Sequence, residues 1–240
     1  MNVRMLTMAC LLLGAVAQAE IPSDDAPDVT DEGLVRVPSS HKAGVYRLPA
    51  ATFDQYRSVM FDPIKIEFKK GWERNHREAT HKDIEILRTD LAAAFRKELK
   101  RELVNRGGYK LVEQASPDTL RVSGQLLETD VTAPKVNAAL KDTYVSNAGS
   151  MKIVVELRDG ASGMLIGRVI SYEFAPDKPD RVVEAAKLGT GNPFPQPQSQ
   201  ISNIGDFRLG FENSARYTHE AINVAKSEKR EEDSRIKTDN

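Results

Sequence analysis

The stretch DIEILRTDLAAAFRKELKRELVNRGG, residues 83–108, carries the clearest periodic pattern in the chain. Its apolar residues recur every three or four positions and would form one stripe on an α-helix: Ile84, Leu87, Leu91, Phe95, Leu99 and Leu103. Acidic residues gather near its start and basic residues near its end, an arrangement that the helix dipole favours. Because glycine readily adopts the left-handed conformation, Gly107 and Gly108 can end the helix. We therefore predict an amphipathic helix over Asp83–Arg106 that covers a sheet.

Segments on both sides of this helix alternate apolar and polar residues, as strands with one buried face do. The segment 64–68 precedes the helix and is joined to it by the polar connection Gly71–Thr80. After the helix, Tyr109–Glu113 can return as a strand, and a turn then leads to an alternating strand at 120–126. The alternation changes phase at residues 126–127, which predicts a β-bulge or a strand edge there.

The second half of the chain predicts a hairpin and another helix. Residues 151–157 alternate up to the turn signal Arg158–Gly163, after which 164–174 can return as an antiparallel strand. A second apolar stripe lies within 207–225 and consists of Phe207, Phe211, Ala215, Thr218, Ile222 and Ala225. The order strand, helix, antiparallel strands, helix predicts an α+β fold. We expect a mostly antiparallel sheet with two main amphipathic helices packed on one face.

Four segments lack such patterns and set the expected boundaries of the domain. Residues 20–44 form an acidic leader that we expect to be flexible, and 227–240 form a charged tail that we expect to be disordered. A loop is expected at 135–149, and a Pro-rich surface excursion at 176–205. The prediction is therefore a single α+β domain over residues 45–226.

The first 19 residues have the pattern of a secretory signal peptide. Arg4 precedes an apolar run of about a dozen residues, too short to span a bilayer, and Ala17 and Ala19 form a small-residue cleavage site before Glu20. We therefore expect cleavage after Ala19. The chain should then be exported without a membrane-spanning segment, and a bacterial periplasm is the expected location.

Cys10 is the single cysteine of the chain and raises the question of lipid anchoring. In a lipoprotein the cysteine would become the first residue after cleavage. Here an apolar run follows Cys10, so cleavage at that point would leave much of the signal segment on the product. We therefore interpret Cys10 as an apolar residue of the signal peptide, which leaves the rest of the chain without disulfides or thiolate chemistry.

The composition is that of an ordinary globular protein. Apolar residues make up 40% of the chain and charged residues 29%, with 34 Lys and Arg against 35 Asp and Glu. The net charge of −1 excludes a strongly basic nucleic-acid-binding protein as a description of the whole molecule, so we expect no nucleic-acid partner.

No catalytic or cofactor motif is apparent. The sequence has no G-x-S-x-G elbow, and the G-x-G at Gly189–Gly191 is followed by Asn-Pro instead of a helix. His76 and His81 are five residues apart, which does not match the spacing of a zinc-protease pair. A metal or pH-sensing role for these histidines with Glu78 stays open, although a solvated polar connection is favoured. We predict no catalytic, cofactor-binding or metal-binding residue and no cofactor.

One helical surface is a candidate for interactions. Arg96, Lys97, Lys100 and Arg101 could contact an anionic surface such as lipid headgroups. The interleaved Glu98 and Glu102 favour a solvated helix face instead. Trp72 and Tyr56 could be exposed recognition aromatics, although anchors at the edge of the core are the favoured interpretation. The stretch Pro193–Pro197 could be bound by a partner in an extended form, or could simply be a loop.

Three segments together resemble an uncharacterised family of bacterial exported proteins, domain of unknown function 3313, in which many members are lipoproteins. The segments are YRSVMFDPIKIEFKKGW at Tyr56–Trp72, GGYKLVEQASPDTLRVSGQL at Gly107–Leu126 and IVVELRDGASGMLIGRV at Ile153–Val169. The resemblance spans about 44–225. Its motifs are strand alternations, a turn and a hairpin, so it implies the fold and a location in the cell envelope but no catalytic residue. The interpretation of Cys10 places lipid anchoring of this chain in doubt.

Two functional hypotheses follow. The first is a non-enzymatic periplasmic protein that binds another envelope component, whether protein, lipid or glycan, or assists its assembly. The second is a secreted hydrolase or small-ligand-binding protein with a site assembled from residues distant in sequence. A pocket that gathers His219 or His76 with carboxylates such as Asp62, Asp130 or Asp159 would favour the second hypothesis.

Overall fold

One mixed, mostly antiparallel sheet organises the computed structural model, which describes residues 28–39, 41, 43–131, 149–175 and 200–238. Its eight described strands are β1 (Val35–Val37), β2 (Gly44–Arg47), β3 (Ser58–Phe61), β4 (Lys65–Phe68), β5 (Lys110–Leu111), β6 (Thr119–Val131), β7 (Gly149–Asp159) and β8 (Leu165–Ala175). They follow the order β1-β2-β8-β7-β6-β3-β5, and β4 also pairs with β6. The neighbouring pairs β1–β2, β2–β8, β8–β7 and β7–β6 are antiparallel. In contrast, β3 and β4 run parallel to β6, and β5 runs parallel to β3.

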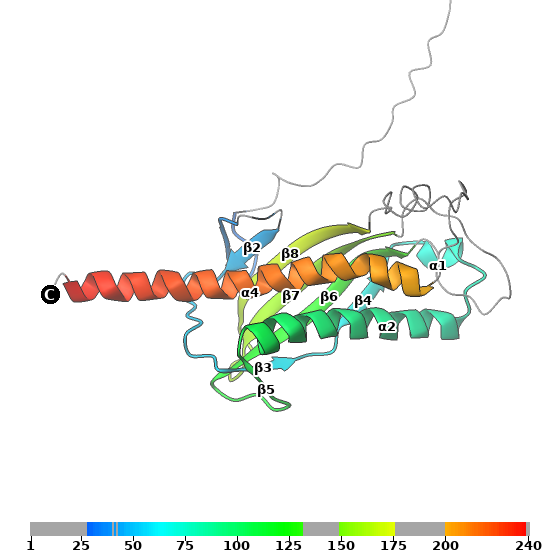
Figure 1. The fold of residues 1–240 in the computed structure, drawn as a ribbon. Helices are drawn as coiled ribbons and strands as arrows, with labels where there is room; N and C mark the ends of the chain where they lie inside the picture. The colour runs from blue at the N-terminus through cyan, green and yellow to red at the C-terminus, as the bar shows by residue number, and fades with distance from the viewer. Residues whose placement is uncertain (1–27, 40, 42, 132–148, 176–199, 239–240) are drawn as a thin grey trace, which may run out of the picture.

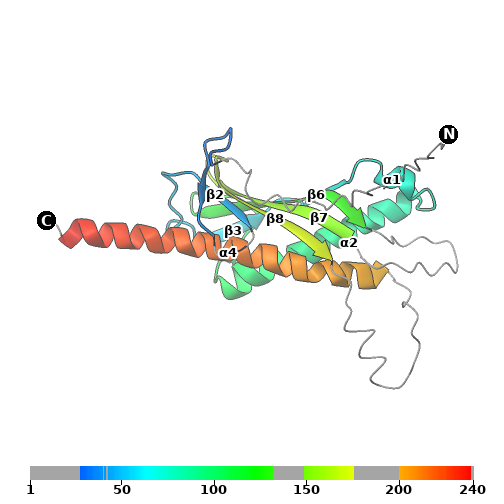
Figure 2. The ribbon, with the colours of Figure 1, turned by 90° about the horizontal axis from the view of Figure 1, so that it is seen from above.

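Two long helices cover one face of this sheet. They are α2 (His81–Lys100), continued by a π-helical turn η1 (Arg101–Arg106), and α4 (Gln200–Thr238); a short helix α1 (Trp72–Asn75) precedes α2. Figures 1 and 2 show α2 and α4 side by side on the same side of the sheet, and the two helices are in contact. The α+β fold predicted from the sequence, with two main helices on one face of a mostly antiparallel sheet, is confirmed.

The helix α2 begins with a capping box that the periodic pattern did not locate. The Thr80 hydroxyl accepts a hydrogen bond from the Asp83 amide at 3.2 Å, and the Asp83 carboxylate accepts one from the Thr80 amide at 3.0 Å. These bonds satisfy amide donors that have no partner within the helix. The helix therefore begins at His81, two residues before the predicted start, and the predicted stop is confirmed because Gly108 adopts a φ of 72°.

The core lies between the sheet and the two helices. All six residues of the stripe predicted on α2 are buried, and so are all six of the stripe predicted on α4. The two stripes meet through aromatic rings, with the centroids of Phe95 and Phe211 5.3 Å apart. Trp72 and Tyr56 are also buried, and each polar atom has a partner: the Trp72 indole donates to the Val131 carbonyl and the Tyr56 hydroxyl donates to Asp159. Both are therefore anchors in the core, as favoured.

The predicted strands are present with different bounds: β6 and β7 are longer than predicted, β8 is shifted by one residue, and β4 and β5 are shorter. The register of β6 on β7 shifts between Leu127 and Asp130, where Glu128 has a φ of 50°, so the bulge predicted at 126–127 is confirmed within two residues. The hairpin between β7 and β8 is also confirmed, with a φ of 70° at Gly163. The sequence did not predict β3. Pro63 follows it and has no amide donor, so the chain pairs with β6 in two separate pieces, β3 and β4.

The boundaries of the domain differ from the predicted ones at both ends. The predicted flexible leader, 20–44, includes ordered structure, because Leu34 is fully buried and β1 pairs with β2. The predicted disordered tail, 227–240, is helical up to Thr238 because α4 continues through it. Two ion pairs, Arg47–Glu228 at 2.7 Å and Arg230–Asp54 at 3.7 Å, attach this continuation to the domain.

Several predictions fall outside the described residues. These are the signal peptide with Ala17, Ala19 and Glu20, and most of the loop at 135–149 and of the excursion at 176–205. The last residues of the predicted excursion are described and do not form a loop: residues 200–205 belong to the start of α4. Within the part of the chain that the structure describes, no helix combines the length and the apolar character needed to cross a bilayer.

Candidate functional site

A cavity of about 290 Å³ opens between β2, β8 and α4 on the helix-covered side of the sheet. Apolar side chains form most of its wall: Val37, Val45, Phe53, Leu157, Val169, Ala221 and Val224. The register of β2 on β8 pairs Val45 with Val169, so these two side chains lie on the same face and line the floor together. The cavity exists because α4 continues past the central strands and covers β2.

Two ion pairs stand at the rim of this cavity. The His41 imidazole Nε2 bonds the Glu220 carboxylate, and the His41 ring stacks on Tyr217 with 4.4 Å between centroids. Arg47 Nη2 lies 2.7 Å from the Glu228 carboxylate. In each pair the basic side chain comes from the β1–β2 region and the carboxylate from α4. The rim is therefore polar, whereas the floor is apolar.

In each rim pair, the basic side chain is more buried than the carboxylate side chain. Arg47 is 23% exposed against 53% for Glu228, and His41 is 29% exposed against 43% for Glu220. Exposed ion pairs of this kind contribute little to stability. The carboxylates can therefore turn into water at small cost, whereas Arg47 is held in the wall by its strand. An apolar cavity with a few polar groups at its mouth has the general form of a small-molecule site.

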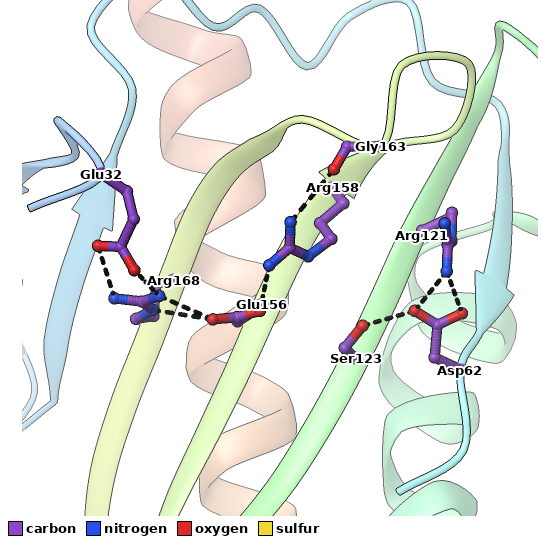
Figure 3. Close-up of polar contacts among 8 residues, drawn as sticks. All are labelled: Glu32, Asp62, Arg121, Ser123, Glu156, Arg158, Gly163 and Arg168. Carbon is purple, nitrogen blue, oxygen red and sulfur yellow. Dashed lines mark hydrogen bonds and ion pairs between the residues drawn. The ribbon is translucent and has the colours of Figure 1, made fainter.

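The opposite face of the sheet carries an ordered network of charges (Figure 3). Arg168 on β8 bonds both Glu32 and Glu156, and Arg158 bonds Glu156 and the Gly163 carbonyl. The hydrogen bond from Arg168 holds the pKa of Glu32 at about 2. Burial opposes the charge of Glu156, but hydrogen bonds from Arg168 and Arg158 outweigh it and lower its pKa. The arginines in this network are matched by carboxylates, so the network orders the strands and offers no unpaired charge to a ligand.

A second part of the same face holds Asp62 (Figure 3). Its carboxylate accepts hydrogen bonds from Arg121 and from the Ser123 hydroxyl on β6. The other carboxylates that the sequence placed in a hypothetical pocket are elsewhere. Asp130 pairs with Lys69 at 3.0 Å, and Asp159 accepts bonds from Ser162 and Tyr56 at the β7–β8 turn. These carboxylates do not converge on one site.

The histidines named from the sequence are also dispersed. His76 stacks on Trp72, with 4.4 Å between ring centroids, and its Nδ1 lies 2.9 Å from the Trp72 carbonyl. His81 is exposed at the start of α2. His219 lies on α4, with Nδ1 3.9 Å from Glu102. Within the described residues, no group of three His, Cys, Asp or Glu side chains could hold a metal ion.

Of the four residues in the predicted anion-binding surface, two have partners within the domain and two are exposed. Arg96 donates to the Asp62 carbonyl at 2.9 Å, next to the point where β3 ends, and Arg101 lies within 3.3 Å of three carboxylates. Lys97 and Lys100 are exposed. A role of the four residues in contacting an anionic surface stays a prediction, but two of their charges are already engaged within the domain.

Glu98 and Glu102 do not lie on a solvated face, as the sequence suggested. They are 3% and 2% exposed, because α4 packs against this side of α2 and η1. Arg101 lies 2.8 Å from Glu98, 3.3 Å from Glu102 and 2.9 Å from Glu212 on α4. Buried carboxylates need such a partner, so this cluster joins the two helices.

The sequence did not single out the residues at the rim of the cavity. His41 and Glu220 are 179 residues apart, His41 lay in the predicted leader, and Glu228 lay in the predicted tail. One signal was available on α4. Tyr217, Ala221, Val224 and Glu228 repeat at steps of four, three and four, which forms a second line beside the predicted apolar stripe. Such a line shows that a helix has a second covered side, but not what covers it.

A family model, described as a protein of unknown function (DUF3313), matches residues 29–217. The chain belongs to this family. The match confirms the resemblance drawn from the strand and hairpin motifs, and it spans every described strand of the sheet. The DUF3313 match ends at Tyr217, so the rim carboxylates Glu220 and Glu228 lie beyond it.

A comparison with curated proteins found no significant match. Among solved structures, the chain is similar to the PelC dodecamer from Paraburkholderia phytofirmans and to a single-substitution variant of it. For the variant, the TM-score is 0.31 and the sequence identity is 9%, and the aligned region covers 73% of this chain and 95% of the PelC chain. For the other PelC structure, the TM-score is 0.30 and the sequence identity is 8%, and the aligned region covers 73% of this chain and 96% of the PelC chain.

Proposed function

We propose that this DUF3313 protein is a non-enzymatic binding module of the bacterial cell envelope, which binds an envelope component or assists its assembly. The cavity between β2, β8 and α4 is its proposed binding site. The observation that carries the proposal is the form of this cavity: about 290 Å³, a mainly apolar wall, and the side-chain pairs His41–Glu220 and Arg47–Glu228 at its rim.

The distribution of charge supports the same choice of site. On the other face of the sheet, Arg168, Arg158 and Arg121 are each matched by a carboxylate in a network within the domain. At the cavity, the pairs are exposed on the carboxylate side and can open at small cost. Binding there does not require the domain to lose contacts of its core.

A photo-crosslinking experiment in living cells tests this proposal. A photoreactive residue replaces Val224, which is 49% exposed at the cavity rim, or Ile86, which is 40% exposed on α2. We expect the Val224 position to crosslink an envelope protein, lipid or glycan, and the Ile86 position to give only background. Equal labelling from the two positions would contradict the proposed site.

The proposed location is the periplasm, reached through export by residues 1–19. Mass spectrometry of the protein from the envelope fraction tests it. We expect a chain that begins at Glu20, because Ala17 and Ala19 form the small-residue cleavage site. A product that begins at a diacylated Cys10 would instead place the protein on a membrane as a lipoprotein.

A hydrolase is the alternative, and one observation favours it. Ser39, His41 and Glu220 line the same cavity, and a serine, a base and a carboxylate are the groups that acyl hydrolases use. The Ser39 hydroxyl, however, accepts a hydrogen bond from the His41 amide at 3.2 Å instead of donating to the ring. Hydrolysis of p-nitrophenyl esters that is abolished by Ser39→Ala would establish the alternative. We expect no turnover above that of buffer.

A further inference from the structure

We infer that the cavity between β2, β8 and α4 binds a small amphiphilic carboxylate, with its hydrocarbon chain in the cavity and its carboxylate on Arg47. The inference rests on the proposed function, because it names the chemical class of the ligand for the same site. Three features of the cavity carry it: its size, the character of its wall and the unequal burial of its charged residues.

The size and the wall specify the hydrocarbon part. At about 30 Å³ for each water-sized group, a cavity of about 290 Å³ accommodates roughly ten non-hydrogen atoms. The floor is built from aliphatic side chains and the Phe53 ring, with Val45 from β2 and Val169 from β8 at its centre. A single short alkyl chain suits this wall, because it buries apolar surface and leaves no polar group without a partner.

The charges specify the polar end. Arg47 is a strand residue with most of its side chain buried, whereas Glu228 is on the exposed side of the pair. A ligand carboxylate can replace Glu228 on the guanidinium, and Glu228 then turns into water. A ligand cation would have to displace Arg47 from the wall and leave a buried charge without a partner. Arginine also binds carboxylates through two parallel hydrogen bonds, which adds geometric preference.

The second rim pair allows the same opening. Glu220 has another cation nearby, since Arg216 Nε lies 3.9 Å from its carboxylate. When Glu220 turns toward Arg216, the His41 ring remains stacked on Tyr217 and the mouth of the cavity widens. Both carboxylates on α4 can therefore leave the mouth: the ligand replaces Glu228 on Arg47, and Glu220 pairs with Arg216.

Calorimetric titration with octanoate, octanol and octylamine tests the inference on the chain as the cell processes it. We expect octanoate to bind with a dissociation constant at least about tenfold below those of the other two, since a charge-assisted hydrogen bond is worth about that factor. Arg47→Gln should remove this preference. Glu228→Gln should tighten octanoate binding severalfold and leave octanol binding unchanged, because it removes the competing carboxylate.

Two further variants locate the ligand and check the fold. Val224→Trp, at an exposed rim position, should block the cavity and abolish binding of octanoate while thermal unfolding is preserved. Arg208→Gln is the control matched to Arg47→Gln. This arginine is 65% exposed on α4 and lies roughly 25 Å along the helix from Val224, so its loss should leave octanoate binding unchanged.

Several results would overturn the inference. They are equal affinity for octylamine and octanoate, unchanged octanoate affinity in a folded Arg47→Gln protein, or no octanoate binding at millimolar concentration. If the Val224 position still crosslinks an envelope component in any of these cases, the proposed function stands and the ligand class alone is wrong. If crosslinking at Val224 also fails, the cavity is not the binding site.

Discussion

At the scale of single residues, Glu173 on the inner face of β8 has a strongly shifted pKa. Burial raises the pKa of its carboxyl to about 7, and the nearby Ser171 hydroxyl offsets this only in part. The side chain fits beneath α4 because position 210 is a glycine: a Cβ there would lie 2.9 Å from the Glu173 Cβ. A protonated carboxyl is therefore favoured in the folded state, and ionisation there opposes folding.

Because the pKa of Glu173 is raised in the folded state, this group makes the protein less stable as pH rises. The folded pKa lies above the ordinary value of 4.5, so the stabilisation is complete below pH 4.5 and is lost as pH rises through about 7. We predict that the unfolding free energy of Glu173→Gln, compared with that of the wild-type protein, is about 2 kcal/mol more favourable at pH 8 than at pH 5. Urea unfolding at the two pH values measures it, with the exposed Glu67→Gln as control. An equal effect at both values would contradict the prediction.

At the scale of elements, the junction of α2, η1 and α4 depends on one arginine. Arg101 lies within 3.3 Å of Glu98, Glu102 and Glu212, and the first two carboxylates are almost fully buried. Arg106 also pairs with Glu102 but is 60% exposed. The two arginines therefore have different energetic weight, although both sit in the same π-helical turn.

Loss of Arg101 should destabilise the junction much more than loss of Arg106. We predict that Arg101→Met costs about 3 kcal/mol of unfolding free energy, because it leaves the buried Glu98 carboxylate without its cation and removes one of the two arginines that pair with Glu102. Arg106→Met should cost about 1 kcal/mol or less, since its pair is exposed on the arginine side. Chemical denaturation of both variants measures the difference. Glu98→Gln in the Arg101→Met background should recover part of the loss, and the absence of any recovery would argue against a charge effect.

The sequence predicted α2 and the β7–β8 hairpin because local periodicity and local turn residues determine them. The stripe Ile84–Leu103 and the turn at Arg158–Gly163 are complete within short segments, and the structure places both as predicted. The burial of Glu98 and Glu102 could not be predicted in the same way. Charged residues beside an apolar stripe read as solvated, and only a cation and a second helix from elsewhere in the chain make their burial tolerable.

At the scale of the whole molecule, the candidate site lies where the two ends of the domain meet. The β1–β2 region supplies His41 and Arg47, and the last third of the chain supplies Glu220 and Glu228. No local pattern relates these residues, so the cavity could not be predicted from sequence, although the second line of residues on α4 could be seen. Figures 1 and 2 show α4 extending beyond the sheet past this point.

This extension should be separable from the domain. The buried stripe of α4 ends at Ala225, and the residues beyond Ser227 include Glu228 and Arg230, which pair with Arg47 and Asp54 through side chains that are mostly exposed on the α4 side. We predict that a chain ending at Ser227 keeps its fold and loses about 1 kcal/mol of unfolding free energy, because exposed pairs contribute little. Circular dichroism should show the loss of the helical signal from residues 228–238 and a single cooperative transition.

The same truncation bears on the ligand. It removes Glu228 and leaves Arg47 in the wall, so octanoate should bind the shortened chain at least as tightly as it binds Glu228→Gln. A shortened chain that folds but no longer binds octanoate would show that the extension holds the cavity in shape. A chain that fails to fold would show that α4 beyond Ser227 stabilises the sheet through more than its ion pairs, contrary to the assignment of the core to residues up to Ala225.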